Sequence, residues 1–381
     1  MWDTRRVNPL QNSFASARLS FVKFVMLPAA LLMAGAGLSA ADEAARVRAL
    51  RVPGALLVLK AELAADGAIH VLADSKSGPQ HVVTRDVGAT FSKPISVVDD
   101  AARRPGLEFG VWDAAIGKDG RVHVVLGNNA WKLKLPKEEW GCFYTSLAPG
   151  AKAFTPVRNI NHKPSEGFSI AAGTAGAVCV NYLSGKLYSM LSRDGGATFS
   201  SAVEPDPAWS PCRCCTTSTA FGSDGMQALL YREETNNERD MWLALWDPAG
   251  AGKVTCTRIS ATPWKVAACP MTYFSVTPRA DGYVAAWPTM GKVYFARLGK
   301  NGAVLPPGEI LTPGTNGMRT GVLALSAPDG AALIAWKNND TLGWQLYSAD
   351  GVPQGVPGST PSPGSGAAGV VLANGKFLLF P

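Results

Sequence analysis

The chain has 381 residues, of which 47% are hydrophobic and 17% are charged, and its formal net charge is +7 at pH 7. No run of Lys and Arg accompanies this mild excess of positive charge, which argues against a nucleic-acid partner. The length, with 40 glycines and 27 prolines, allows one or two ordinary domains or one large repeat domain.

The N-terminal segment has the order of a secretory signal peptide: basic residues, then an uncharged run at residues 24–38, then small residues up to Ala41. We predict a signal peptide at residues 1–41 and a single mature domain at residues 42–381, exported to the periplasm or the extracellular medium. Removal of four basic residues and one acidic residue lowers the formal net charge from +7 to +4. A retained membrane anchor is disfavoured because the apolar run has 15 residues, whereas about 20 are needed to span a bilayer. No later segment is long and apolar enough, so no stable membrane span is expected after cleavage.

Beyond the signal peptide, short apolar runs alternate with Gly, Asp, Asn and Pro, and no long stretch keeps a helical period, which indicates an all-β domain. A hairpin made of an apolar run, a glycine turn and a second apolar run recurs at intervals of 45 to 57 residues. The turn glycines are Gly67, Gly120, Gly176, Gly225, Gly282, Gly330 and Gly375. A further strand and turn follow each hairpin except the last. Four-stranded units of about 50 residues, repeated around an axis, predict a β-propeller.

Two turns in this series have nearly the same sequence, at residues 84–91 and 192–199. In each, Asp is expected to bond to the backbone of its own loop, Gly to supply a positive φ, and Phe to pack into the sheet. We interpret both as structural turns, formed by Thr84, Asp86, Gly88 and Phe91 in the first and by Ser192, Asp194, Gly196 and Phe199 in the second. The pattern resembles the Asp-box (BNR) repeat of sialidases and related β-propellers, which implies a propeller fold and says much less about activity.

The number of blades is open between six and seven. Six units look complete, and sialidase-like propellers have six blades, so the resemblance implies six. The hairpin around Gly375 marks a seventh unit that has no third strand after it. Residues 45–51, left over at the N-terminus, can supply that strand and close the ring, so the hairpin count favours seven.

Propeller geometry predicts which loops carry a ligand site. If the strands of each blade are labelled A to D from the axis outwards, the Asp-box turns join C to D on one face. The D-to-A and B-to-C loops share the opposite face around the central channel. We therefore expect a small-molecule or glycan ligand on that face, where the candidate residues are Trp112, His162, Glu166, Arg232, Glu233, Arg239, Asp240 and Arg319.

Seven cysteines in an exported chain are expected to meet an oxidising compartment, and the odd number leaves at least one unpaired within the chain. Cys212, Cys214 and Cys215 precede one A strand and Cys269 precedes the next, so their sulfurs are expected to lie close together. Three interpretations stay open: a disulfide from one of the three to Cys269, a soft-metal site for copper or zinc to which Met271 can contribute, and a redox-active dithiol. No other cofactor is indicated.

The sialidase resemblance implies a catalytic set of three arginines that hold a carboxylate, a Tyr nucleophile activated by Glu, and an Asp as acid/base. Residue by residue, the match is partial. Arg51 and Arg232 fall in segments similar to the family's, whereas Arg319 has only the right loop position. Asp74 is the available acid/base, on a shortened loop, and no Tyr and Glu pair can be assigned. The catalytic set is therefore expected to be incomplete.

A closer resemblance is to exported, sialidase-like BNR-repeat proteins that have a Cys-x-Cys-Cys segment, an Arg- and Asn-rich loop and a later Cys-Pro, here residues 212–215, 232–240 and 269–270. Our leading interpretation is a ligand-recognition propeller without the sialidase reaction. The alternatives are an exo-acting glycoside hydrolase of the sialidase type and a metal-binding or redox protein of the cell envelope. The sequence indicates no oligomeric state.

Overall fold

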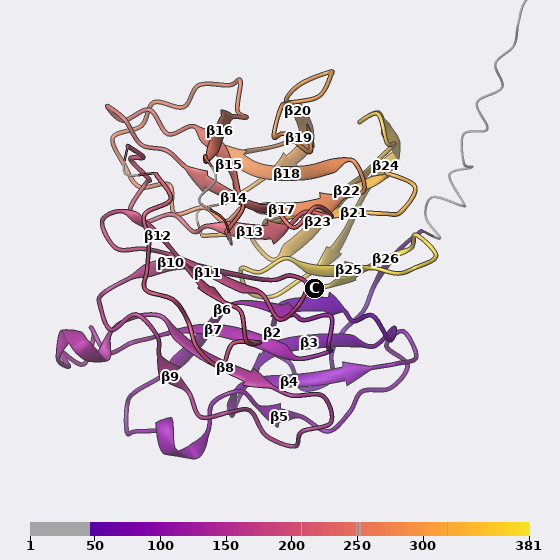
Figure 1. Ribbon diagram of the computed structural model, residues 1–381. Coiled ribbons are helices and arrows are strands. Elements are labelled where there is room, and N and C mark those ends of the chain that lie inside the picture. The colour runs from indigo at the N-terminus through magenta and orange to yellow at the C-terminus, as the bar shows by residue number, and fades with distance from the viewer. Residues whose placement is uncertain (1–45, 207, 249, 251–252, 318) are drawn as a thin grey trace, which may run out of the picture. The chain divides into compact units, whose positions relative to one another are not determined.

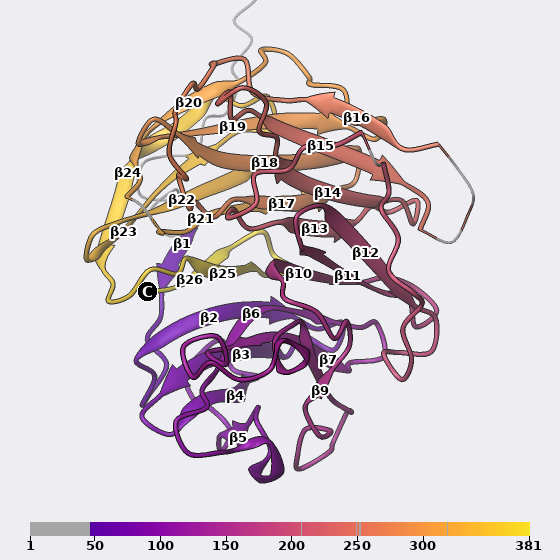
Figure 2. The same ribbon diagram turned by 90° about the vertical axis from the view of Figure 1, so that its left-hand side faces the viewer.

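The computed structural model describes residues 46–206, 208–248, 250, 253–317 and 319–381, so the predicted signal peptide lies outside the described residues. These residues form an all-β domain, a β-propeller of seven sheets, or blades (Figures 1 and 2). Helical structure within the described part consists of two single 3₁₀ turns, Asp100–Ala102 and Lys137–Glu139. None of its helices is long and apolar enough to cross a membrane.

Each of the first six blades is built from consecutive strands, with the first strand innermost. Blade 1 contains β2 (Leu57–Leu63), β3 (Ile69–Ser75), β4 (Gly78–Thr84) and β5 (Ile95–Ser96), and blade 2 contains β6 (Phe109–Ile116), β7 (Val122–Asn128), β8 (Phe143–Leu147) and β9 (Arg158–Asn159). Blade 3 contains β10 (Glu166–Ala172), β11 (Val178–Leu183) and β12 (Leu187–Ser192), and blade 4 contains β13 (Ser218–Phe221), β14 (Gln227–Arg232), β15 (Met241–Trp246) and β16 (Thr255–Arg258). Blade 5 contains β17 (Ser275–Arg279), β18 (Gly282–Thr289), β19 (Lys292–Gly299) and β20 (Ile310–Thr315), and blade 6 contains β21 (Val322–Ser326), β22 (Ala332–Asn338), β23 (Thr341–Tyr347) and β24 (Pro353–Pro361).

Blade 7 joins the two ends of the domain. Its inner strands β25 (Ala368–Val371) and β26 (Phe377–Phe380) are completed by β1 (Val47–Ala49), which runs parallel to β26 with Val47 opposite Phe377. In Figure 2 the indigo β1 accordingly lies beside the yellow β26. The prediction that the N-terminal segment closes the ring is confirmed, and the count of seven from the hairpins is correct. The six blades implied by the sialidase resemblance are wrong for this chain.

Middle strands of the blades are buried on both faces because each blade is packed between two neighbours. All eight residues of β18 are buried, so the strand reads as a continuous apolar run rather than an alternating one. Its Trp287 is fully buried and packs with Leu243 and Leu245 of the preceding blade. Apolar packing between consecutive blades therefore holds the domain together.

The two similar turns have the same hydrogen bonds. Asp86 accepts bonds from the hydroxyl of Thr84 (2.8 Å) and from the backbone N–H of Thr90 (2.8 Å), and the hydroxyl of Thr84 accepts from the N–H of Gly88 (2.8 Å). In the second turn, Asp194 accepts bonds from the hydroxyl of Ser192 (2.7 Å) and from the backbone N–H of Thr198 (2.9 Å). The hydroxyl of Ser192 accepts from the N–H of Gly196 (2.8 Å). Each turn follows the third strand of its blade, so the face opposite to these turns carries the loops before the inner strands.

Candidate ligand site and cysteine cluster

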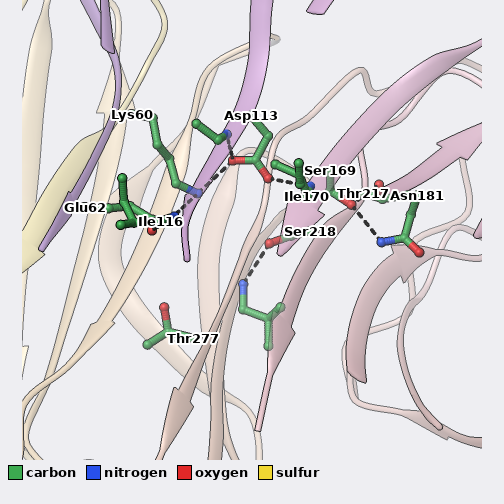
Figure 3. A network of polar contacts seen from close by, with 12 residues as sticks. Lys60, Glu62, Asp113, Ile116, Ser169, Ile170, Asn181, Thr217, Ser218 and Thr277 are labelled. Atoms are coloured by element: carbon green, nitrogen blue, oxygen red, sulfur yellow. Dashed lines mark hydrogen bonds and ion pairs between the residues drawn. The ribbon is translucent and has the colours of Figure 1, made fainter. Parts of the chain in front are cut away.

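A series of polar side chains links the inner strands of neighbouring blades from blade 1 to blade 6 (Figure 3). Innermost strands are sheet edges, so part of their backbone N–H and C=O groups lack a strand partner. Asp113 of β6 accepts a bond from the N–H of Ile170 in β10 (3.1 Å), and Glu62 of β2 accepts from the N–H of Ile116 in β6 (3.0 Å). Side chains of one blade thus satisfy edge groups of the next.

The same device continues in blades 4 to 6. The hydroxyl of Ser218 accepts from the N–H of Val276 (3.1 Å), and the hydroxyl of Thr277 donates to the carbonyl of Ala324 (2.8 Å). Between blades 3 and 4, the hydroxyls of Ser169 and Thr217 lie 2.7 Å apart. These polar contacts fix the positions of the inner strands relative to one another.

Lys60 is held between two carboxylates in this series of contacts. Its Nζ lies 2.7 Å from Asp113 Oδ1 and 3.7 Å from Glu62 Oε1. Burial alone would lower the pKa of Lys60, but the charges of Asp113 and Glu62 outweigh it and raise that pKa. Burial raises the pKa of Glu62 against the opposing effect of Lys60. The ammonium group therefore stays charged and paired at neutral pH.

The mouth of the channel forms a cavity of about 340 Å³ on the face predicted to bind a ligand. Lys60 and Asp113 lie on its wall, and two of the four aromatic residues that line it are exposed, Trp112 with 40% and Tyr273 with 39% of its surface. Trp112 packs edge to face on Phe168, with ring centroids 5.1 Å apart. Such a cavity combines exposed aromatic faces with a few fixed polar groups, the usual composition of a small-molecule site.

Gly127 makes room for the indole of Trp112. A Cβ atom at this position of β7 would lie 2.5 Å from Trp112 Nε1 and 3.3 Å from a ring carbon of Phe168. The position of the aromatic wall therefore depends on a glycine in the neighbouring strand.

The three arginines considered for carboxylate binding do not converge on this cavity. Arg51 is exposed and donates to the carbonyl of Pro361 (3.3 Å). Arg232 is 1% exposed, donates to three protein oxygens and lies over the ring of Trp264. Arg319 is exposed and its Nε lies 3.2 Å from the sulfur of Met271. The candidate acid/base Asp74 is the next-to-last residue of β3, and burial raises its pKa.

The other predicted residues are distributed over the same loops. Trp112 borders the cavity, whereas His162 and Glu166 are exposed at the entrance to β10. Glu233 accepts from the N–H of Ser210 (2.8 Å) and Asp240 pairs with Arg258 (2.9 Å), so both have contacts within the protein. Lys60, Glu62, Asp113 and Tyr273 are not among the residues predicted from the sequence. Charged residues inside apolar inner strands were the available signal for the first three.

The predicted cysteine cluster forms beside the cavity, because Cys215 directly precedes the cavity residue Thr216. Cys214 is joined to Cys269 by a disulfide, which links the loops that enter blades 4 and 5. Cys212 and Cys215 are buried free thiols whose Sγ atoms lie 3.2 Å apart, and Cys212 Sγ lies 3.8 Å from Cys214 Sγ. The sulfurs of Cys212, Cys214 and Cys269 all lie within 4.8 Å of one another, a spacing that could hold a metal ion, but two of them are joined in the disulfide.

The pKa values of Cys212 and Cys215 are shifted in opposite directions. The S–H of Cys215 donates to Cys212, and Arg239 donates to the same sulfur (2.9 Å), which together lower the pKa of Cys212 to about 6. The contact with Cys212 and burial raise the pKa of Cys215. The structure therefore favours one thiolate and one thiol at neutral pH.

The fold and the channel define the class of this protein: a seven-bladed β-propeller with a cavity at one mouth of its channel. No family model matches the chain, and no curated protein matches it in sequence. Among solved structures it is similar to streptogramin B lyase, with 14% identity, 87% of this chain and 92% of that chain covered, and a TM-score of 0.55. It is also similar to an α-L-arabinanase of Penicillium chrysogenum complexed with arabinobiose, with 13% identity, 80% and 96% covered, and a TM-score of 0.51. A chain of a mitotic checkpoint complex is also similar, with 14% identity, 87% of this chain and 90% of that chain covered, and a TM-score of 0.53. Because all three identities are low, these similarities show the fold alone.

Proposed function

We propose that this protein is an exported, sialidase-like BNR propeller that binds a neutral saccharide at the mouth of its channel and lacks the sialidase reaction. The observation that carries this proposal is the pair of exposed rings, Trp112 and Tyr273, on a cavity whose wall holds the Lys60 and Asp113 ion pair. The apolar face of a sugar ring packs on an aromatic ring, while its hydroxyls bond to polar groups beside it. A volume of about 340 Å³ suits one end of a glycan, since ligand pockets begin at roughly 300 Å³.

The charges around the cavity favour a neutral ligand over an acidic sugar. No arginine belongs to the described residues that line it, and the ammonium group of Lys60 is paired with Asp113. A sugar carboxylate would have to displace Asp113 from Lys60 and would meet the charge of Glu62 nearby. Sugar hydroxyls can donate to free lone pairs of the Asp113 carboxylate without that competition. The arabinanase with bound arabinobiose makes neutral oligosaccharides the first ligands to test.

Glycoside hydrolysis is the second candidate, because Asp113 and Glu62 both approach Lys60 and therefore form a pair of carboxylates in the channel. Both carboxylates, however, are hydrogen-bonded to backbone N–H groups of the next blade, Asp113 to Ile170 and Glu62 to Ile116. A structural role explains these bonds, so binding without turnover has the stronger support.

The test is a glycan-array screen of the mature protein followed by calorimetric titration of the best ligand. Trp112→Ala is expected to weaken binding about tenfold or more, since loss of a stacked ring removes roughly 1.5 kcal/mol. Trp131→Ala is the matched control, because Trp131 is 59% exposed but does not line the cavity. Equal loss of affinity in both variants, or strict preference for sialic acids, would contradict the proposal. Release of free sugar, abolished in Asp113→Asn, would establish the hydrolase instead.

The export part of the proposal is tested separately. N-terminal sequencing of the protein recovered from the producing cells is expected to start near Asp42, after removal of residues 1–41. Recovery of the intact N-terminus from the membrane fraction would support the retained anchor.

A further inference from the structure

We infer that the cluster of Cys212, Cys214, Cys215 and Cys269 is a binding site for a thiophilic d¹⁰ cation, Zn²⁺ or Cu⁺, that opens when the Cys214–Cys269 disulfide is reduced. This site is separate from the proposed saccharide cavity, so either can exist without the other. It uses residues that no step of ligand binding at the channel mouth requires.

Three sulfurs of the cluster lie close to one another, and the fourth lies beside one of them. Cys212, Cys214 and Cys269 form a triangle in which no two Sγ atoms are more than 4.8 Å apart, and Cys215 Sγ lies 3.2 Å from Cys212 Sγ. In a tetrahedral zinc site with bonds of about 2.3 Å, sulfurs are about 3.8 Å apart. The 3.8 Å between Cys212 Sγ and Cys214 Sγ already has this value. Reduction of the disulfide lets the sulfurs of Cys214 and Cys269 separate to the same distance.

The backbone around the cluster supplies a rigid support. The N–H of Cys215 bonds to the carbonyl of Cys212 (3.2 Å), so residues 212–215 form a tight turn that directs both buried sulfurs inward. Cys269 comes from the loop before blade 5, with its Cα 6.5 Å from that of Cys214. Ligands on two neighbouring loops can therefore close around one ion with little movement of the chain.

Two arginines balance the charge that thiolate ligands would bring. The guanidinium of Arg239 donates to Cys212 Sγ (2.9 Å), and the buried Arg232 interacts electrostatically with both Cys212 and Cys215. Four thiolates and Zn²⁺ have a net charge of −2, which the two guanidinium groups neutralise. Three thiolates and Cu⁺ have the same net charge, so the surroundings suit either ion.

Opening the site requires a two-electron reductant, such as an external dithiol. One thiolate of the dithiol attacks a sulfur of the Cys214–Cys269 bond, which breaks and releases the other cysteine as a thiolate. The second thiolate of the dithiol then displaces the first cysteine, and the dithiol becomes a disulfide. The two released cysteines join Cys212 and Cys215 as ligands, and binding of the cation releases the protons that the four thiols still carry.

The experiment is a competition titration of the purified protein with a chromogenic chelator, before and after anaerobic treatment with dithiothreitol and its removal. Zn²⁺ and Cu⁺ are titrated in separate samples to distinguish the two ions. We expect one equivalent of cation per reduced chain and at least 100-fold weaker binding to the oxidised chain. The Cys269→Ser variant, which cannot form the disulfide, is expected to bind the cation without reductant through its three remaining cysteines.

Cys212→Ser should weaken binding to the reduced protein by about 100-fold, whereas Cys256→Ser, on the outer strand of blade 4, should leave it unchanged. Protection of the four cysteines from alkylation by the added cation, mapped by mass spectrometry, tests the site in the unsubstituted protein. Equal binding by oxidised and reduced protein would overturn the redox-dependent opening. Equal binding by the Cys212→Ser protein, or alkylation of all four cysteines despite the cation, would overturn the site.

Discussion

The bond between Asp113 and the next blade provides the most direct test of how the channel is held together. The Asp113 carboxylate accepts three hydrogen bonds, from Lys60 Nζ (2.7 Å), from the N–H of Ala114 (2.9 Å) and from the N–H of Ile170 (3.1 Å). Replacement of Asp113 by Ala removes all three acceptor contacts at once. It leaves the buried N–H of Ile170 on the edge of β10 without this partner.

The expected loss follows from the kind of bond. A hydrogen bond to a charged group contributes about 1.5–3 kcal/mol, and an unsatisfied buried donor costs about 1–3 kcal/mol. The ion pair with Lys60 adds little, since the lysine side chain is 34% exposed in the channel and is screened by water. We therefore expect Asp113→Ala to lower the free energy of unfolding by about 2–4 kcal/mol. Asp113→Asn keeps one oxygen acceptor and should lose about half as much.

The assay is urea unfolding followed by tryptophan fluorescence and by far-UV circular dichroism, whose coincidence tests for a single transition. Lys60→Met is the matched control, because it removes the ion pair and leaves the bond from Asp113 to Ile170 in place. Its expected loss is below about 1 kcal/mol. If Asp113→Ala were no more destabilised than Lys60→Met, the bond between blades would not have the role that we assign to it.

Three further predictions concern separate parts of the propeller. Gly127→Ala should push Trp112 out of position and weaken binding of the array-selected saccharide, as measured by calorimetry. In the Trp112→Ala background the same Gly127 substitution should have no further effect on affinity. Additive losses of affinity would contradict the role of Gly127 in positioning Trp112. Arg232→Lys should lower the free energy of unfolding by about 2–4 kcal/mol, because Lys cannot reproduce the three hydrogen bonds of the buried guanidinium group. The urea midpoint should fall accordingly, and an unchanged midpoint would show that those bonds are unimportant. Thr90 and Thr84 donate to Asp86 and lower its pKa to about 2, so the stability that this carboxylate adds should be complete above about pH 4 and lost as the pH falls through 2. Thermal unfolding of wild type and Asp86→Asn should therefore differ at pH 6 and converge near pH 2, and a constant difference would refute the assigned pKa.

The sequence was sufficient for the fold because a propeller repeats a local device. All seven glycines assigned to hairpin turns lie at or beside the turn between the first two strands of a blade, from Gly67 to Gly375. A turn glycine and the two apolar runs on either side of it lie within about 20 residues of sequence, so each hairpin can be recognised locally. The closure by Val47–Ala49 was also predictable, since a blade lacking a strand was left at one end and an unused strand at the other.

The candidate site was less accessible to sequence reasoning because its contacts join different blades. Lys60 and Asp113 are 53 residues apart, and no local pattern shows that they pair between neighbouring blades. Arg232 was considered a ligand-binding residue from its loop, yet its guanidinium is buried by Trp264 and the oxygens around it. The cysteines were found because two loops preceding adjacent inner strands must approach the axis together. Their pairing was left open, since sequence does not give the direction of each sulfur.

The parallel contact of β1 with β26 has a consequence for the order in which the domain assembles. Six blades consist of consecutive residues and can form as the chain becomes available, whereas β1 pairs with residues about 330 positions away, at a closure cost of roughly 5 kcal/mol. The ring is therefore expected to be sealed last, by a three-residue strand that contributes few bonds of its own. Arg46 adds to this seal through bonds to Gly375 and Asp329. The first large excursion of the folded domain should accordingly be detachment of its N-terminal strand, which would leave the β25–β26 hairpin held to blade 1 by side-chain packing alone.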